Sequence, residues 1–342
     1  MSYKQSYRYP SELISIHLFL TGYLISLFVK ILPILELLSL LPFILCYFIL
    51  LIRLISTVNF KNHLIVLGFT LIFILQCVQK PFYVNDLIRL NLNILLFTVP
   101  SKTLHIKWKN LYKTVFIFLF LVQAIDFFVV LFPREITVKN DALGLFRAGN
   151  EFAVYTCIVL LLGSNKMNFI LSLISGLFSS VKFSIFLPLY KIFSKRSKKG
   201  LLAIVILIPL VVYILLLNNK ELNYLLSNQS IGLLSIITSF RFDRLLDNWQ
   251  TLFGEISSIA YYEMDLIDLF QMTGYTSLII YTYLFRKLYL LFVRAKSLWI
   301  YLPLFLYSFF FGHVIFSTTF GLLIITLKFL LNENNKSDIQ LH

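Results

Sequence analysis

The sequence predicts an all-α polytopic membrane protein with about twelve transmembrane helices and a long extracytoplasmic loop before the last three spans. Of its 342 residues, 59% are hydrophobic and 13% are charged, and the mean hydropathy is +0.85. Water-soluble domains carry about 25% charged residues. The apolar residues fall in blocks of about 15 to 25, separated by short charged connections, as in helices that cross lipid. We therefore expect one integral membrane domain over residues 1–342.

The expected spans follow the apolar blocks along the chain. A basic start precedes the first block but no small-residue cleavage site follows it, so we expect a first span rather than a cleaved signal peptide. The blocks also contain Cys46, Cys77 and Cys157, without a CxxC motif, so we expect neither a disulfide nor a metal role for them. The spans are 13–29, 36–56, 63–79, 86–100, 114–132, 151–163, 168–180, 183–193, 200–217, 265–285, 298–313 and 315–332.

Three of these segments have alternative interpretations. Segment 86–100 contains Asp86, Arg89, Asn91 and Asn93, so it is either a span packed inside the bundle or an interfacial helix. Segments 168–180 and 183–193 are each short for a bilayer and are either a hairpin or one continuous helix. The charge distribution favours the hairpin.

The distribution of basic residues predicts the orientation. Most of the 30 Lys and Arg residues fall in segments that a cytoplasmic N-terminus places inside, including the runs at 194–200 and 286–296. Cytoplasmic loops of membrane proteins carry such an excess. We therefore expect both termini in the cytoplasm, and we attribute the net charge of +14 to topology rather than to a nucleic-acid partner.

In this topology the long connections, 133–151 and 218–264, are both extracytoplasmic. Acidic residues gather there, whereas the inside segments carry almost only Lys and Arg. Any chemistry is therefore expected at the outer face.

Basic residues near that face are candidates for binding phosphate. Arg147 precedes a span, where it meets either lipid phosphate or a phosphate-bearing substrate. Lys182 lies at the tip of the expected hairpin, where it either snorkels to water or pairs with an anion. Arg241 and Arg244 share a helical face with Asp247, a spacing that also fits a solvated amphipathic helix.

Carboxylates and one histidine are candidates for proton transfer. Glu263, Asp265 and Asp268 open a span, where they suit the helix dipole and where a buried carboxylate would bind sugar hydroxyls or accept a proton. His313 stands at an outer span junction, as either an interfacial side chain or a base or hydrogen-bond donor. The sequence contains no HExxH, DxD or Walker motif, so we expect no metal, no cofactor and no direct use of ATP.

Four segments, taken in order, resemble the O-antigen polymerase and ligase superfamily of bacterial envelope glycosyltransferases, which includes capsular polysaccharide polymerases. They are FRAGNEFAVY (146–155), SSVKFS (179–184), YEMDLIDLFQMTGYTSLIIY (262–281) and FGHVIFSTTFG (311–321). The resemblance covers roughly residues 110 to 330. It implies a multi-span helical fold.

The resemblance also implies a metal-independent glycosyltransferase. Such an enzyme moves a growing glycan from its undecaprenyl-diphosphate carrier onto a new lipid-linked repeat unit at the outer face of the plasma membrane. The residues expected to hold the diphosphate are Arg147, Lys182, Arg241 and Arg244. The residues expected to help deprotonate the acceptor hydroxyl are His313, Glu263 and Asp265.

The same pattern leaves two other functions open. One is a ligase that attaches finished glycan to another acceptor, although the carboxylate-rich re-entry at 261–281 favours a polymerase. The other is a flippase or transporter of lipid-linked oligosaccharides, which would be expected to carry charges deep in a central pathway, often with repeat symmetry. Expected partners are the undecaprenyl-diphosphate-linked oligosaccharide and membrane lipids. A chain-length regulator is an optional further partner.

Overall fold

The computed structural model of the protein is helical throughout the residues it describes. These residues are 10–56, 60–79, 83–101, 108–129, 145, 149–162, 166–179, 182–194 and 264–340. Within these ranges no strand is present, so the predicted all-α class is confirmed there.

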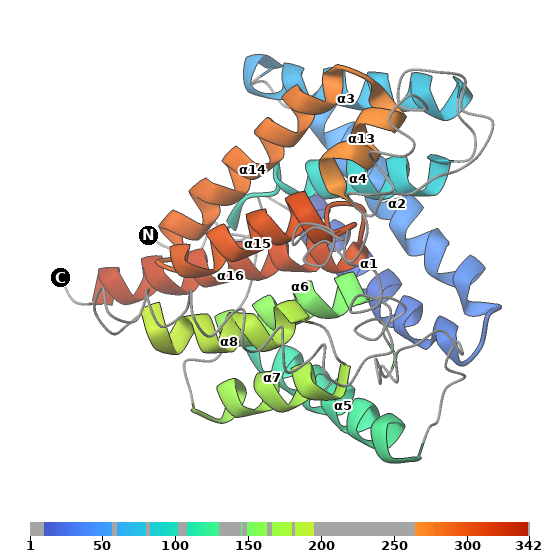
Figure 1. Cartoon of the computed structure of the whole chain (residues 1–342). Helices are drawn as coiled ribbons and strands as arrows, with labels where there is room; N and C mark the ends of the chain where they lie inside the picture. Colours follow the sequence, from blue (N-terminus) through green and yellow to red (C-terminus); the bar gives the residue numbers. More distant parts are fainter. Residues whose placement is uncertain are drawn as a thin grey trace, which may run out of the picture. The chain divides into compact units, whose positions relative to one another are not determined.

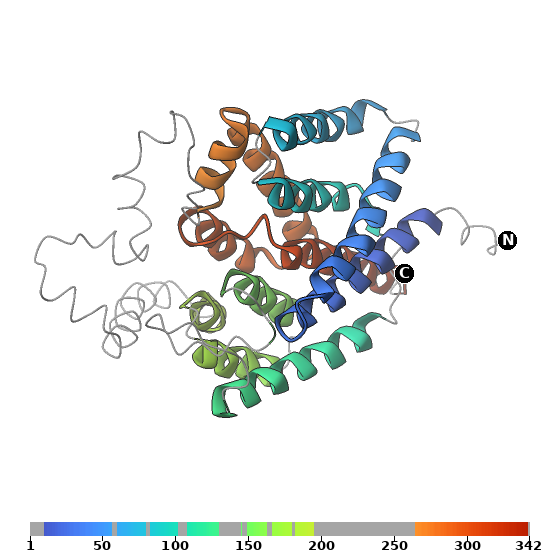
Figure 2. The same ribbon diagram turned by 90° about the vertical axis from the view of Figure 1, so that its right-hand side faces the viewer.

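The helices begin and end close to the predicted apolar blocks (Figures 1 and 2). They are α1 (Pro10–Leu27), the short 3-10 helix η1 (Phe28–Lys30), α2 (Leu35–Ser56), α3 (Phe60–Gln79), α4 (Val84–Leu96), α5 (Trp108–Val129), α6 (Gly149–Leu162), α7 (Lys166–Ser179), α8 (Lys182–Ser194), α13 (Asp265–Thr273), α14 (Thr276–Arg294), α15 (Leu298–Phe311) and α16 (Thr318–Gln340). The predicted span 200–217 lies outside the described residues.

The chain divides into two compact units. Unit 1 is made of Met1–Tyr112, Asp265–Leu298 and His313–His342, and it contains α1 to α4, α13, α14 and α16. Unit 2 is made of Lys113–Met264 and Trp299–Gly312, and it contains α6 to α8 and most of α5 and α15. The expected single membrane domain stays a prediction.

Two helices, α2 and α14, are long and apolar enough to cross a membrane. Shorter apolar segments of 10–17 residues lie in α1, α3, α5, α6, α15 and α16. Among the described residues the structure therefore does not reach the predicted count of about twelve full spans. The physical reason is the length of the apolar segments, because a helix rising 1.5 Å per residue needs about 20 apolar residues to cross the hydrocarbon, and these segments have 10–17.

The predicted span 265–285 is two helices rather than one. Helix α13 ends at Thr273, and Gly274 follows in the left-handed region with φ +64°. Its N–H donates to the carbonyl of Phe270 at 2.7 Å, which closes the last turn of α13 before α14 begins at Thr276. Glycine adopts this conformation at no steric cost, so Gly274 is the residue that breaks the helix.

Helix α4 lies inside unit 1, in contact with α2, α3 and α16. Every residue from Leu90 to Leu96 is buried, including Asn91 and Asn93. The Asn91 side chain accepts from Thr70 Oγ1 and donates to Tyr47 OH, both at 3.0 Å. Helix α4 is thus packed within the helix bundle of unit 1, as the first interpretation of segment 86–100 requires, and its place relative to a membrane stays a prediction.

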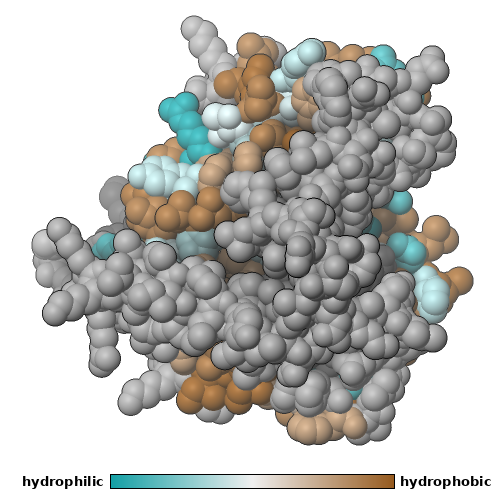
Figure 3. All heavy atoms as spheres, in the orientation of Figure 1, coloured by the Kyte–Doolittle hydropathy of each residue, from teal (hydrophilic) through white to brown (hydrophobic). Residues whose placement is uncertain are grey.

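Helix α2 is apolar on both its buried and its exposed faces. Its buried face includes Phe43 and Leu50, while Leu37 is 74% exposed and Ile52 is 65% exposed. Figure 3 shows broad apolar areas among the described atoms of the surface. A helix that is apolar all round belongs in a large core or in lipid, and large exposed apolar patches are rare on soluble monomers.

In unit 2, the segment from 166 to 194 forms two helices, α7 and α8, which contact each other and α6. The structure thus agrees with the hairpin rather than with one continuous helix. Buried hydrogen bonds join these helices to their neighbours: Thr156 Oγ1 donates to Ser184 Oγ at 2.9 Å, and Gln123 Nε2 donates to the carbonyl of Ser175 at 3.0 Å.

Candidate functional site

Two carboxylates occupy the first turn of α13 in unit 1. Asp265 and Asp268 are three residues apart, which places them on one side of the helix, and both are completely buried. Negative charge is favoured at a helix N-terminus, where unpaired N–H groups and the helix dipole are positive. The local sequence therefore explains why these residues begin a helix, but the partners of their carboxylates come from elsewhere in the chain.

The partner of Asp268 is His313, in the connection 312–317 between α15 and α16. Nδ1 of His313 lies 2.9 Å from Oδ2 of Asp268. The imidazole also stacks on Phe316, with ring centroids 4.3 Å apart and an interplanar angle of 22°. The ring is thus fixed by a carboxylate at one nitrogen and by an aromatic face.

Asp265 binds the backbone of the same connection. Its Oδ1 and Oδ2 accept from the N–H of Ile315 at 3.2 and 3.3 Å. Asp265 therefore holds the backbone two residues after His313 by hydrogen bonding. Its carboxylate is completely buried.

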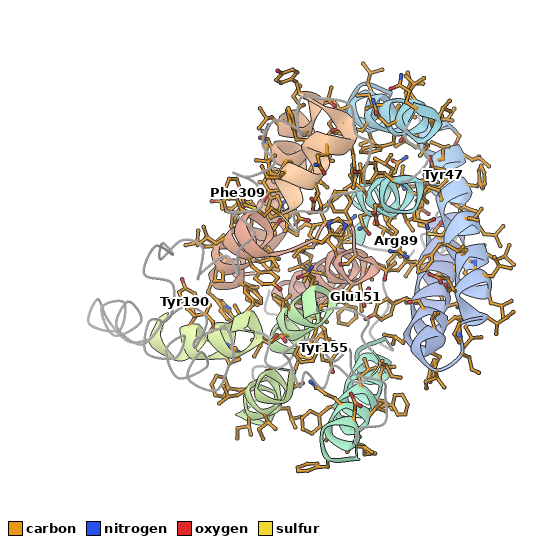
Figure 4. All side chains as sticks on the ribbon, turned by 45° about the vertical axis from the view of Figure 1, so that its right-hand side comes forward. Tyr47, Arg89, Glu151, Tyr155, Tyr190 and Phe309 are labelled. Atoms are coloured by element: carbon orange, nitrogen blue, oxygen red, sulfur yellow. The ribbon has the colours of Figure 1, made fainter. Side chains whose placement is uncertain are left out.

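Asp86, in the first turn of α4, faces the other nitrogen of His313. Its Oδ2 is 3.9 Å from Nε2, and its Oδ1 is 4.0 Å from Nη1 of Arg89. The exposed fractions of these side chains are 0% for Asp268, 22% for His313, 15% for Asp86 and 34% for Arg89. Figure 4 labels Arg89 on α4. The side chains therefore range from completely buried at Asp268 to partly exposed at Arg89, and Asp86 is the carboxylate of the cluster that has exposed surface.

The carboxylates keep His313 protonated. Burial alone would lower the pKa of this imidazole, but the interactions with Asp268 and Asp86 and the charge of Asp265 outweigh it and raise the pKa from 6.5 to about 10. At neutral pH the site is thus an imidazolium between two carboxylates. Its ring is a hydrogen-bond donor at both nitrogens rather than a free base.

Carbonyls at the other end of α4 accept from a lysine. Lys328, in α16, is buried, and its Nζ donates to the carbonyls of Leu96 at 2.7 Å, Phe97 at 2.9 Å and Val99. These carbonyls belong to the last residue of α4 and to the turn after it, where basic side chains commonly bind.

A second basic side chain lies at the same end of α4. Nε of Arg53 is 2.7 Å from Oε1 of Glu12, and its Nη1 donates to the carbonyl of Thr98 at 3.4 Å. The two ends of α4 therefore differ in the side chains that lie at them, with carboxylates at its start and the basic residues Lys328 and Arg53 at its end.

The structure brings together only part of the predicted site. His313 and Asp265 are held in the same cluster, whereas Glu263, Arg147, Arg241 and Arg244 lie outside the described residues. Lys182 is the first residue of α8, as expected for the start of the second hairpin helix.

Three members of the cluster were not among the predicted catalytic residues. Asp268 appeared in the sequence only as the third carboxylate of a group, and its spacing from Asp265 was the available signal. Asp86 and Arg89 appeared as polar residues in a weak span, and their position gave no sign that Asp86 would meet a histidine more than 200 residues later. No group of three or more His, Cys, Asp or Glu side chains suited to a metal occurs among the residues that the structure describes.

The chain matches no protein-family model, no curated protein and no solved structure.

Proposed function

We propose that the chain is a membrane glycosyltransferase that polymerises undecaprenyl-diphosphate-linked oligosaccharide repeat units into O-antigen or capsular polysaccharide. The observation that carries the proposal is the 2.9 Å contact between His313 and Asp268. These residues belong to two of the four segments that resemble the superfamily, 311–321 and 262–281. A histidine braced by a buried carboxylate is also a recurrent arrangement in acid–base and group-transfer chemistry.

A multi-span membrane arrangement accounts best for the surface of the helices. Exposed leucine and isoleucine side chains on α2, α3 and α14 would be solvated by lipid. We propose that the shorter apolar helices also lie within the bilayer, which approaches the twelve spans expected from the sequence. The positive-inside bias supports a cytoplasmic position for the Arg53 and Lys328 end of α4. His313 is then at the extracytoplasmic end, with both chain termini inside.

The transfer requires a proton acceptor for the attacking hydroxyl. The hydroxyl oxygen of the acceptor sugar bonds to the anomeric carbon of the donor, the bond from that carbon to the diphosphate breaks, and undecaprenyl diphosphate leaves with the electron pair. Because His313 is already protonated, we assign the hydroxyl proton to Asp86, the carboxylate nearest to the surface. His313 then holds and orients Asp86 through Nε2.

The charge of the cluster disfavours a diphosphate at His313. Asp86, Asp265 and Asp268 carry three negative charges against the positive charges of His313 and Arg89, which leaves a net charge of −1. A neutral sugar hydroxyl suits this environment better than a polyanion. We therefore propose that the cluster takes the acceptor, while the diphosphate of the donor is held by the basic residues expected from the sequence, Arg147, Lys182, Arg241 and Arg244.

Deleting the gene and separating the surface glycan on a gel tests the proposal. We expect the null strain to carry glycan capped at one repeat unit. Wild type and His17→Ala should restore the ladder, because His17 lies on an exposed part of α1. His313→Ala should not restore it at equal protein level, because the variant loses the imidazole that orients Asp86.

Other results of the same experiment contradict polymerisation. Long chains that accumulate on the lipid carrier in the null strain indicate a ligase. Single repeat units that accumulate on the cytoplasmic side indicate a flippase. A full ladder in the His313→Ala strain removes His313 from the chemistry.

A further inference from the structure

Side chains from two helices hold the connection that carries His313. The backbone of Ile315 is bound on both sides, because its N–H donates to Asp265 and its carbonyl accepts from Nδ2 of Asn93 at 2.9 Å. Nδ2 of Asn93 also donates to the carbonyl of Ser317 at 3.0 Å. One amide group therefore fixes two carbonyls that lie two and four residues after the imidazole.

The connection is also closed onto α16. Ser317 is the residue before the helix, and its Oγ accepts from the N–H of Phe320 at 3.2 Å, as an N-cap serine does. The same hydroxyl donates to the carbonyl of Val314 at 2.8 Å. This local bonding shapes the turn, but it does not orient the turn toward α13 or α4. Asp265 and Asn93 supply that orientation.

Asn93 and Asp86 lie on the same face of α4. They are seven residues apart, which is close to two helical turns. The helix that presents the Asp86 carboxylate to Nε2 of His313 thus also carries the amide that fixes the chain after His313. Asn93 is 1% exposed, so its bonds are not weakened by competition with water.

The space for Asn93 is created by a glycine on α16. A Cβ added at Gly321 would come within 2.5 Å of Asn93 Oδ1, within 2.5 Å of Phe19 and within 2.9 Å of Leu96. Lys328 lies seven residues beyond Gly321 and binds the end of α4. Helices α4 and α16 are therefore parallel and are joined at two levels, near His313 and at the opposite end.

We infer that Asn93 is a positioning residue of the His313 site, which it aligns with Asp268 and Asp86 by holding the carbonyls of Ile315 and Ser317. The charged groups that act on His313 come from two helices, Asp265 and Asp268 from α13 and Asp86 from α4, and Arg89 in turn faces Asp86. A displaced connection moves the imidazole away from both sets of carboxylates. The relevance to catalysis rests on the proposed function, but the alignment itself is a property of the free protein.

Asn91 provides a matched control. It lies on the same helix, is 2% exposed and makes two side-chain hydrogen bonds, but its partners are Tyr47 and Thr70 rather than the connection at 312–317. An effect of losing any buried asparagine of α4 would appear in both variants. An effect on the position of His313 would appear only at Asn93.

The test is a titration of the His313 imidazole by nuclear magnetic resonance of histidine-labelled protein in lipid nanodiscs, without substrate. The chain has five histidines, and His313→Gln identifies the signal. In Asn93→Ala we expect the proton-binding constant of His313 to fall by about tenfold or more, one pKa unit, while Asn91→Ala matches wild type. Asn93→Leu, which retains the side-chain volume without the amide, should show the same fall if Asn93→Ala does not fold.

The inference is overturned if the pKa of His313 in the folded Asn93 variants equals that of wild type. It is also overturned if Asn91→Ala lowers this pKa by the same amount. Because no substrate is present, this result is independent of the glycan experiment. A normal ladder in the His313→Ala strain would remove the proposed function and leave the alignment standing. A wild-type pKa of His313 in the Asn93 variants would refute the role of Asn93 in aligning His313 but would not bear on the proposed function.

Discussion

Replacing Asp268 with asparagine is expected to reduce glycan polymerisation by about 10²–10⁴-fold without unfolding the protein. Asparagine has nearly the same shape, so the packing around the first turn of α13 is retained. It carries no negative charge, however, and its amide can meet Nδ1 of His313 with a donor. The pKa of His313 falls toward its ordinary value, and Asp86 loses the partner that orients it. The measurement is ladder intensity per amount of membrane protein.

The loss of folding stability in Asp268→Asn should depend on pH. A histidine whose pKa is raised in the folded state stabilises the fold fully below its unfolded value and loses that contribution as the pH rises through the folded value. For His313 these values are 6.5 and about 10. The loss of stability in Asp268→Asn should therefore be largest near pH 6 and decrease toward pH 10.

Asp126→Asn is the matched control for Asp268→Asn. Asp126 is an equally buried aspartate, 1% exposed, but it lies on α5 in unit 2. Equal loss of the ladder in both variants would show that burial of any aspartate, rather than pairing with His313, explains the effect. Full activity of Asp268→Asn would remove the His313–Asp268 pair from the chemistry.

The second large effect is expected at the opposite end of α4. Arg53→Ala should lower the free energy of unfolding by about 3–5 kcal/mol, because it leaves the Glu12 carboxylate buried without its guanidinium partner. The Glu12 side chain is 2% exposed, and its Oε2 has no hydrogen-bond partner among the residues that the structure describes, so Arg53 supplies the main compensation for its charge there. The measurement is reversible unfolding in mixed micelles.

A double variant separates the charge from the packing. Glu12→Leu with Arg53→Met removes both charges and keeps apolar volume, and it should recover most of the stability that Arg53→Ala loses. If the double variant is as unstable as the single one, packing of the Arg53 stem rather than the buried charge accounts for the loss. If Arg53→Ala is as stable as wild type, the Arg53–Glu12 ion pair contributes nothing to the free energy of unfolding.

The sequence predicts the helices better than their contacts. Hydrophobic blocks place α1 to α8 within six residues at each end, because helix length and apolar composition are local properties. Gly274 was a signal for the break between α13 and α14. The apolar residues on both sides of it nevertheless led to the prediction of one continuous span. The resemblance of the four segments to the superfamily predicted Asp265 and His313 as site residues. It did not predict which carboxylate contacts the imidazole.

The least predictable feature is the contribution of α4. A span with Asp86, Arg89, Asn91 and Asn93 looks weak when it is read alone, since each polar side chain costs free energy in an apolar setting. For the two asparagines this cost is offset by partners outside α4: Tyr47 and Thr70 for Asn91, and the connection after His313 for Asn93. Such pairings depend on tertiary structure and follow from no local pattern.

The most direct test of polymerisation uses purified protein in lipid vesicles. The substrate is the undecaprenyl-diphosphate-linked repeat unit extracted from the deletion strain, with no nucleotide sugar, ATP or divalent metal added. We predict one undecaprenyl diphosphate released for each new glycosidic bond, lipid-linked glycans of increasing length, and neither product with His313→Ala. Repeat units that remain single, with no undecaprenyl diphosphate released by folded wild-type protein, would contradict the assignment of this chain as the polymerase.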